Sequence, residues 1–179
     1  MENIIQNSHN ELKFRKPVLN DGYAIYQLIK SSPPLDLNSS YLYFLQASHF
    51  SDTCIVVEQD DVIIGFISAY YQPNKPQSLF VWQVAIAESA RGQGLAKAML
   101  LALIKSQPSD SAMTELACTI SPSNKASQGL FGSFAKTHGL IMQTSPFINE
   151  AHFGEDNHEA EDLYTIRASD NTKLIPYFS

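Results

Sequence analysis

The sequence predicts a single α/β domain whose mixed, mostly antiparallel central sheet is flanked by helices. Three observations indicate this class. The first half carries apolar runs joined by short turns, as in an antiparallel meander. In the second half, strand-like and helix-like runs alternate, which favours parallel pairing. The chain has 179 residues, a length typical of one domain with one core.

A short strand and two helices are expected first. Apolar residues recur at helical spacing in two segments, and Asn20-Asp21 and Asn38-Ser39 supply oxygen atoms that can cap them. Pro33-Pro34 separates the two helices, because proline removes a backbone donor and clashes inside a helix. The expected elements are a strand at 12–15 and helices at 20–30 and 38–49.

Three strands follow. The turn Gln59-Asp60-Asp61 lies between two apolar runs and predicts a hairpin. A loop with Pro73 and Pro76 precedes the third run. The expected strands are 54–58, 62–71 and 79–87.

The second half alternates helices with strands. A run of small and large apolar residues after Gly92 indicates a buried helix, and Gly139 ends a second one. The expected elements are helices at 92–105 and 124–137 and strands at 114–120 and 163–168. The polar residues 1–11 are expected to form a flexible lead-in, 12–170 the domain, and 171–179 a tail.

Composition excludes several classes of function. The net charge of -6 disfavours nucleic acid as a partner. No apolar run approaches the ~18 residues of a membrane span, and the polar start has no signal-peptide pattern. We therefore expect a cytoplasmic protein away from membranes. Cys54 and Cys118 lie in apolar runs without metal-binding spacing, so we expect two buried thiols and no metal.

The sharpest local pattern is a strand that runs through a basic, glycine-containing turn into a helix. Gly92 and Gly94 allow the backbone to approach a ligand closely. The amides at the start of the helix have no intrahelical acceptor and lie at the positive end of the helix dipole. Pyrophosphate suits such a turn, with Arg91 adding a charged donor. Glycines that only turn the chain are the ordinary alternative.

A second strand-to-helix exit follows at Ser121-Pro122-Ser123-Asn124. Asn124 can cap the helix that begins there. Two consecutive exits of this kind leave a cleft between parallel strands, and ligands of open α/β sheets bind at such carboxyl ends.

These residues resemble the Gcn5-related N-acetyltransferase (GNAT) superfamily. Its coenzyme A signature, Gln/Arg-x-x-Gly-x-Gly/Ala, is met by Arg91, Gly94 and Ala96. The resemblance implies a GNAT-like sheet with a parallel-strand splay that holds acetyl-coenzyme A as cosubstrate, contacted through backbone groups of the splayed strand. The cofactor-binding residues it implies are Val84, Ile86, Arg91, Gly92, Gln93, Gly94, Leu95, Ala96 and Asn124.

Three further segments, 33–41, 80–84 and 158–164, together resemble the L-2,4-diaminobutyrate acetyltransferase family, the acetylating enzymes of ectoine biosynthesis. This resemblance implies acetylation of the γ-amine of L-2,4-diaminobutyrate and a homodimer. Another small primary amine as acceptor, such as a polyamine or a protein N-terminus, stays open. So does a coenzyme A-binding module without catalysis.

A diamine substrate with one carboxylate suits a pocket that offers anions. Asp36 and Glu161 are the candidates for holding ammonium groups. Trp82 is expected to wall the cavity and donate its indole N–H, and His158 to contact the substrate carboxylate or a backbone oxygen. Tyr41 is expected to reach the substrate or the leaving sulfur. For each of these residues, a cap, a surface charge or core packing is the ordinary role.

The chemistry requires a neutral amine at the thioester. Deprotonating an alkyl amine of pKa ~10.4 at neutral pH costs about 4–5 kcal/mol, so the site must accept a proton through a carboxylate or a water bound to one. Glu161 is the candidate base, and the Val84 N–H is a candidate donor to the oxyanion. Phe131 stands where many GNAT members carry a tyrosine that protonates the leaving thiolate. Here Tyr41 or solvent takes that role, or the thiolate leaves without being protonated.

Overall fold

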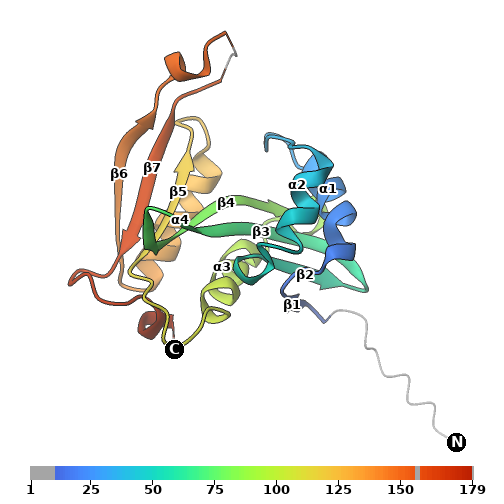
Figure 1. The fold of residues 1–179 in the computed structure, drawn as a ribbon, viewed down its shortest axis with the longest axis horizontal. Coiled ribbons are helices and arrows are strands. Elements are labelled where there is room, and N and C mark those ends of the chain that lie inside the picture. Colours follow the sequence, from blue (N-terminus) through green and yellow to red (C-terminus); the bar gives the residue numbers. More distant parts are fainter. Residues whose placement is uncertain (1–10, 156–157, 179) are drawn as a thin grey trace, which may run out of the picture.

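A computed structural model describes residues 11–155 and 158–178. Its strands form one seven-stranded sheet in the order β1-β2-β3-β4-β5-β7-β6 (Figure 1). The strands are β1 (Lys13–Arg15), β2 (Ile55–Gln59), β3 (Val62–Gln72), β4 (Lys75–Ile86), β5 (Glu115–Ile120), β6 (Ile141–Ile148) and β7 (Glu161–Arg167). The α-helices in the described part are α1 (Gly22–Lys30), α2 (Ser40–Gln46), α3 (Leu95–Lys105) and α4 (Lys125–Thr137).

Helices cover both faces of this sheet. The larger core lies between the sheet and α3 and α4, with Leu103, Leu116 and Phe134 fully buried. A smaller core lies under α1 and α2, with Ile25, Tyr43 and Phe66 at its centre. The predicted mixed α/β fold is confirmed: every neighbouring strand pair is antiparallel except β4 and β5.

The parallel pair β4–β5 is joined over a short distance only. The pairing joins Ser78, Leu79 and Phe80 to residues 115–117. Beyond Phe80, β4 continues to Ile86 without pairing to β5. The two strands therefore diverge towards their carboxyl ends. In Figure 1, α1 and α2 stand on one side of this divergence and the β6–β7 hairpin stands on the other.

A buried carboxylate holds β4 and β5 together at the end where they are still paired. The Glu115 side chain on β5 is 2% exposed. It accepts hydrogen bonds from Lys75 Nζ at 2.7 and 2.8 Å and from Ser78 Oγ at 2.6 Å, and it also binds the Arg167 guanidinium of β7. Burial alone raises the pKa of a carboxyl, but these three donors hold the pKa of Glu115 below its ordinary value. Glu115 thus ties β4, β5 and β7 together.

A β-bulge interrupts the pairing of β3 with β4. Ser68 faces Gln83 while Ala69 faces Val81, so Trp82 is the extra residue. The Gln83 N–H donates to the Ser68 hydroxyl at 3.2 Å. A bulge bends its strand and re-aims the side chains near it, and here it leaves Trp82 half exposed and Gln83 buried.

Several boundaries differ from the expectation. β6 was not predicted, because its polar residues and Pro146 give no apolar alternation and the strand lies exposed at the sheet edge. β4 begins at Lys75 rather than at 79, so Pro76 lies inside a strand. α2 ends at Gln46, and α3 begins only after Gly94.

The expected caps were right for one helix and wrong for two. Asn124 Oδ1 accepts from the Ser127 N–H at 3.0 Å and caps α4. Asp21 makes no cap hydrogen bond to α1; its carboxylate binds Arg15 and the Val18 N–H instead. Ser39 precedes α2 without a side-chain cap bond.

The expected lead-in falls mostly on residues 1–10, which lie outside the described residues. The segment proposed as a tail carries two buried side chains, Leu174 and Phe178. Phe178 stacks on Phe134 of α4 at 5.6 Å between ring centroids. Residues 171–178 therefore pack onto the core of the domain.

We predict that Glu115→Gln lowers the free energy of unfolding by about 3 kcal/mol, the lower end of the range for breaking a buried ion pair. The lower end applies because Lys75 and Arg167 remain 38% and 37% exposed. Chemical denaturation at pH 7 measures it. Asp52→Asn is the control: the Lys16–Asp52 pair is exposed, so the change stays within about 1 kcal/mol.

The same variant has a pH signature. The lowered pKa means that Glu115 stabilises the fold above the ordinary carboxyl pKa and loses this contribution as the pH falls through its lowered folded-state value. Glu115→Gln should therefore show a shallower loss of stability on acidification. An unchanged acid limb would contradict the assignment.

Candidate active site

The glycine turn between β4 and α3 has the geometry of an anion cradle. Gly92 and Gly94 adopt φ values of 76° and 77°, a left-handed conformation that favours glycine. A Cβ at either position would meet no atom within 4 Å, so the space beside the backbone is open. Gly94 is the N-cap of α3, and no side chain caps this helix. Its first amides are thus available to a ligand.

The predicted cofactor-binding residues, apart from Asn124 at the start of α4, lie in this turn, in the first turn of α3 and on the strand before it. Val84 and Ile86 are half-buried on β4, beyond the point where its pairing with β5 ends. Arg91 is exposed, and its Nε donates to the Ile86 carbonyl oxygen at 3.1 Å, which leaves the rest of the guanidinium in solvent. Leu95 is buried and anchors α3 in the core, and Gln93 is exposed.

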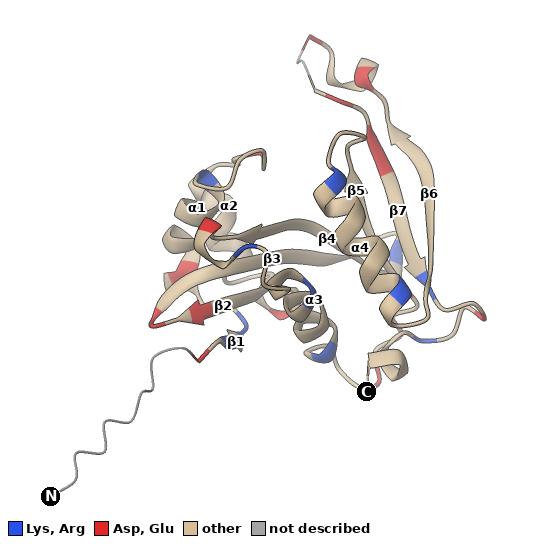
Figure 2. Cartoon of the chain, turned by 180° about the vertical axis from the view of Figure 1, so that it is seen from behind, with Lys and Arg blue, Asp and Glu red and all other residues tan. Residues whose placement is uncertain are grey.

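Asp36, His158 and Glu161 come together from distant parts of the chain. His158 Nε2 lies 3.4 Å from Asp36 Oδ2, across 122 positions of sequence. The charges of both residues act on Glu161. Figure 2 shows acidic residues on both the α1–α2 loop and the start of β7. The structure therefore brings together three of the predicted acceptor-site residues.

Glu161 is the carboxyl best placed to take up a proton. Burial raises its pKa above the ordinary value, and the charges of Asp36 and Glu159 raise it further. The Thr119 hydroxyl donates to Glu161 and acts in the opposite direction, as does His158. A carboxyl with a raised pKa is a better proton acceptor than an ordinary one.

The surroundings of His158 favour its protonated form. Its Nδ1–H donates to the Glu159 carbonyl oxygen at 2.7 Å, and this bond and the Asp36 carboxylate raise the pKa of His158. The ring stacks on Phe153 with centroids 4.1 Å apart. Because Nδ1–H is committed to the carbonyl, Nε2 is the ring nitrogen that faces the cluster, 3.4 Å from Asp36 Oδ2.

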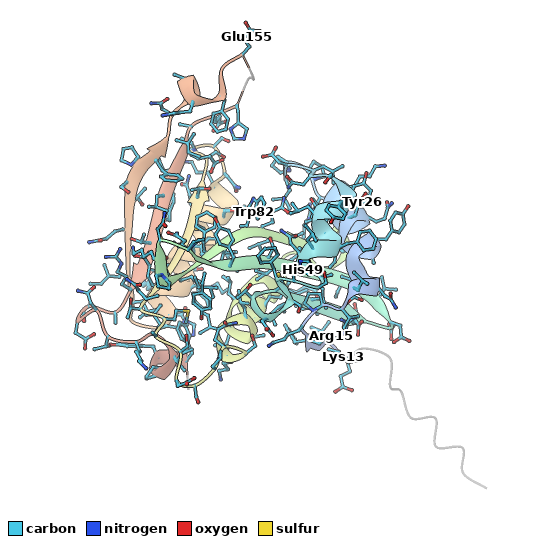
Figure 3. The ribbon with its side chains drawn as sticks, in the orientation of Figure 1. Lys13, Arg15, Tyr26, His49, Trp82 and Glu155 are labelled. Carbon is cyan, nitrogen blue, oxygen red and sulfur yellow. The ribbon has the colours of Figure 1, made fainter. Side chains whose placement is uncertain are left out.

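Trp82 lies on β4 between the α1–α2 pair and the β6–β7 hairpin (Figure 3). It is 48% exposed and packs edge-on against Tyr70, with centroids 6.3 Å apart. The position suits the predicted cavity wall. Tyr41, at the start of α2, is 69% exposed, and its hydroxyl has no recorded hydrogen bond in the described part of the chain. The structure therefore leaves its predicted role untested.

Four residues near this cluster were missed in the sequence: Gln83, Thr119, Phe153 and Tyr70. Gln83 Nε2 donates to the Asp36 carbonyl oxygen at 2.8 Å. A polar residue inside the apolar run 79–87 was the available signal for Gln83. The others carry no signal, because only the fold brings Thr119 to Glu161, Phe153 to His158 and Tyr70 to Trp82.

The expected buried thiols are confirmed. Cys54 and Cys118 are free and buried. Burial raises the pKa of Cys54 to about 12 and raises that of Cys118 as well, so neither is a thiolate nucleophile. Phe131 is 3% exposed in the larger core, so no hydroxyl is present there to protonate a leaving group. Among the described residues, no group of His, Cys, Asp and Glu is arranged to hold a metal.

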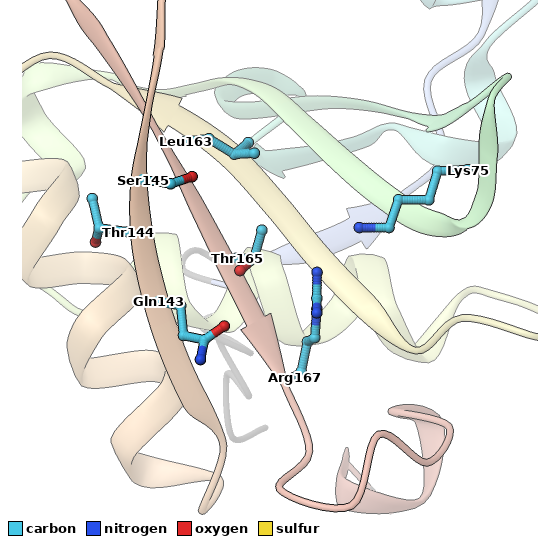
Figure 4. A pocket seen from close by; sticks show the side chains of 7 residues that line it. All are labelled: Lys75, Gln143, Thr144, Ser145, Leu163, Thr165 and Arg167. Carbon is cyan, nitrogen blue, oxygen red and sulfur yellow. The ribbon is translucent and has the colours of Figure 1, made fainter.

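A separate hollow of about 450 Å³ lies on the β6–β7 side of the sheet. Figure 4 shows Lys75 and Arg167 approaching β5 from opposite sides in it. Both cations are already bound to Glu115. None of the predicted site residues lines this hollow, so it is distinct from the candidate site.

The site thus has two parts with opposite electrostatic character. The α3 turn offers amides and a cation to a phosphate-bearing ligand, and the Asp36–Glu161 cluster offers carboxylates to an amine. The divergence of β4 and β5 lies between them. The residues fit acetyl-coenzyme A on the α3 side: open space at two left-handed glycines and an uncapped helix start are what a pyrophosphate requires.

Comparison with known proteins agrees with this fit. The model of the acetyltransferase (GNAT) family matches residues 22–135, so the fold and the site are those of an acetyl-coenzyme A-dependent transferase. The ribosomal-protein-S18-alanine N-acetyltransferase of Escherichia coli shares the fold, with a TM-score of 0.62 at 15% identity. Among the described helices, none is long and apolar enough to span a membrane.

Relatives of higher sequence identity indicate which acetyltransferase family the chain belongs to. L-2,4-diaminobutyric acid acetyltransferase of Vibrio cholerae serotype O1 is 43% identical over 86% of this chain and 88% of its own length. That of Vibrio parahaemolyticus is 45% identical over 86% and 84%. Diaminobutyrate acetyltransferase EctA from Paenibacillus lautus, solved with L-2,4-diaminobutyric acid and coenzyme A, has a TM-score of 0.84 at 40% identity, covering 88% of this chain and 95% of its own. The chain belongs to the L-2,4-diaminobutyric acid acetyltransferase family.

We predict that Gly94→Ala raises the KM for acetyl-coenzyme A by roughly tenfold or more, the loss of about one charge-assisted hydrogen bond. The added methyl group lies where the pyrophosphate would bind. Steady-state kinetics with acetyl-coenzyme A varied measures the effect.

Gly139→Ala is the matched control, because Gly139 also has a positive φ, 65°, and open space at its Cβ, but lies at the far end of α4. Both variants should lose about 1–2 kcal/mol of stability from left-handed strain. If both raise the KM equally, the turn is not a phosphate cradle.

Proposed function

We propose that this protein transfers the acetyl group of acetyl-coenzyme A to the γ-amine of L-2,4-diaminobutyrate, giving N4-acetyl-L-2,4-diaminobutyrate in ectoine biosynthesis. The observation that carries the proposal is the convergence of Asp36, His158 and Glu161 on one side of the divergent strands, opposite the α3 turn. A diamine with one carboxylate suits two anionic groups and one cationic group, and this cluster offers two carboxylates and an imidazole whose pKa is raised.

Each charged group then has a partner. Asp36 holds the α-ammonium of the substrate, and protonated His158 binds its carboxylate. The indole N–H of Trp82 adds a donor, and its ring walls the methylene chain. With the α-carbon held in this way, the side-chain amine is the group free to reach towards the thioester near Val84.

Catalysis follows from the raised pKa of Glu161. The carboxylate accepts a proton from the γ-ammonium, and the neutral nitrogen attacks the thioester carbon. The Val84 N–H stabilises the oxyanion. As the C–S bond breaks, the attacking nitrogen releases its second proton to solvent and the thiolate of coenzyme A departs. Solvent or Tyr41 protonates the thiolate, because Phe131 has no hydroxyl.

We also propose a homodimer in the cytoplasm. β6 is an edge strand on which Ile141 and Phe147 are 48% and 57% exposed, and a partner subunit would cover them. The free thiols of Cys54 and Cys118 suit a reducing compartment. The molar mass in solution, measured by light scattering, tests the dimer.

The regiochemistry tests the function. We expect acetylation of the γ-amine alone, with lysine (two methylenes longer) and 2,3-diaminopropionate (one shorter) poorer by about 10–200-fold per misplaced methylene. NMR analysis of the products, with the three amino acids at equal concentration, measures this. Acetylation of the α-amine, or equal turnover of lysine, would leave only a general N-acetyltransferase. Binding of acetyl-coenzyme A without thiol release would indicate a non-catalytic module.

Glu161→Gln tests the base. We expect kcat to fall by about 100-fold to 10,000-fold, the range for general base catalysis. Because the base works only when ionised and its pKa is raised, activity of the parent enzyme should fall with decreasing pH already above the ordinary range of a glutamate. This limb should be missing from the pH profile of the variant.

Glu159→Gln is the matched control, since Glu159 is an exposed glutamate two positions away that accepts from the Ser123 N–H. It should leave kcat within about twofold. A similar loss in both variants would point to the charge of the segment rather than to a base.

A further inference from the structure

Gln83 connects the central strand to the loop that carries Asp36. It is 5% exposed, and its Nε2 donates to the Asp36 carbonyl oxygen at 2.8 Å across 47 positions of sequence. Asp36 itself is well exposed, with 81% of its side chain accessible. The loop position of this carboxylate is therefore set through its main chain, by a side chain that is fixed in the core.

This contact has an energetic cost elsewhere on the same amide. Gln83 Oε1 is buried and has no hydrogen-bond partner in the described part of the structure. The amide cannot simply be turned over, since Oε1 would then face the carbonyl oxygen of Asp36. A buried acceptor without a partner destabilises a fold, and methionine, which has a similar size, would avoid that cost. Stability alone does not explain a glutamine here.

The bulge at Trp82 fixes the backbone of Gln83 as well. Its N–H donates to the hydroxyl of Ser68, which is 1% exposed. Both the main chain and the side chain of Gln83 are therefore tied in place, next to the exposed Trp82 and one residue before Val84. One short stretch of β4 thus carries Trp82 and Val84, to which the proposed function gives the cavity wall and the oxyanion donor, and it also holds the Asp36 loop through Gln83.

We propose that Gln83 is a positioning residue for the amino-acid substrate: it holds the Asp36 loop so that the carboxylate meets the α-ammonium group. Gln83 does not contact the reacting atoms and acts through Asp36. This inference rests on the proposed function, because it assigns the acceptor site of that reaction.

The test is Gln83→Met, which keeps the bulk and removes both the donor and the unpaired oxygen. We expect the KM for diaminobutyrate to rise roughly tenfold or more, as for the loss of one hydrogen bond that orders a charged group. The KM for acetyl-coenzyme A should stay within about twofold, and the melting temperature should be unchanged or higher. Gln46→Met is the matched control, because Gln46 of α2 is also buried with an unpartnered Oε1. It should leave both KM values unchanged.

A double-mutant cycle with Asp36→Asn separates positioning from a direct contact. If Gln83 acts through Asp36, Gln83→Met should add little to the KM for diaminobutyrate in the Asp36→Asn background. Additive effects, an unchanged KM for diaminobutyrate in Gln83→Met, equal changes in both KM values, or a variant that does not fold would each overturn the proposal. Failure of the parent enzyme to acetylate diaminobutyrate in the same assay would instead refute the proposed function.

Discussion

The ion-paired carboxylate of Glu115 is the constraint on which the rest of the structure depends. It draws β4, β5 and β7 together at one end of the sheet through Lys75, Ser78 and Arg167. A parallel pair held at one end only can diverge at the other, where its backbone groups become available to ligands. The phosphate turn and the acidic cluster both lie at this open end, so the geometry of the site depends on a group that takes no part in the chemistry.

Two glutamates on one face of the sheet show how position decides protonation. Glu115 lies among two cations and a hydroxyl, which lower its pKa. Glu161 is held on the same face at the far end of β7, among carboxylates and with one hydroxyl, and burial raises its pKa. Arg167 and Glu161 are six residues apart on one strand, roughly 20 Å. Because of that separation, one glutamate can join three strands while the other serves as the candidate base.

Local patterns predicted the strand–turn–helix units well, because the glycines near α3 and the Asn124 cap act over a few residues. β6 escaped prediction, since an exposed edge strand with Pro146 needs no apolar alternation. The contact of His158 with Asp36 has no local signal at all. Family resemblance named those residues, but only the fold shows them to be neighbours. Gln83 stands out in the sequence as a polar residue in an apolar run, but its bond to the Asp36 carbonyl oxygen is visible only in the fold.

The two parts of the site approach the divergent strands from opposite faces of the sheet: the α3 turn from the face covered by α3 and α4, and the Trp82–Asp36 side from the face covered by α1 and α2. An acetyl donor and an amine acceptor that bind from opposite faces of the sheet can occupy the site at the same time. Direct transfer between two molecules bound at once needs no acetylated enzyme.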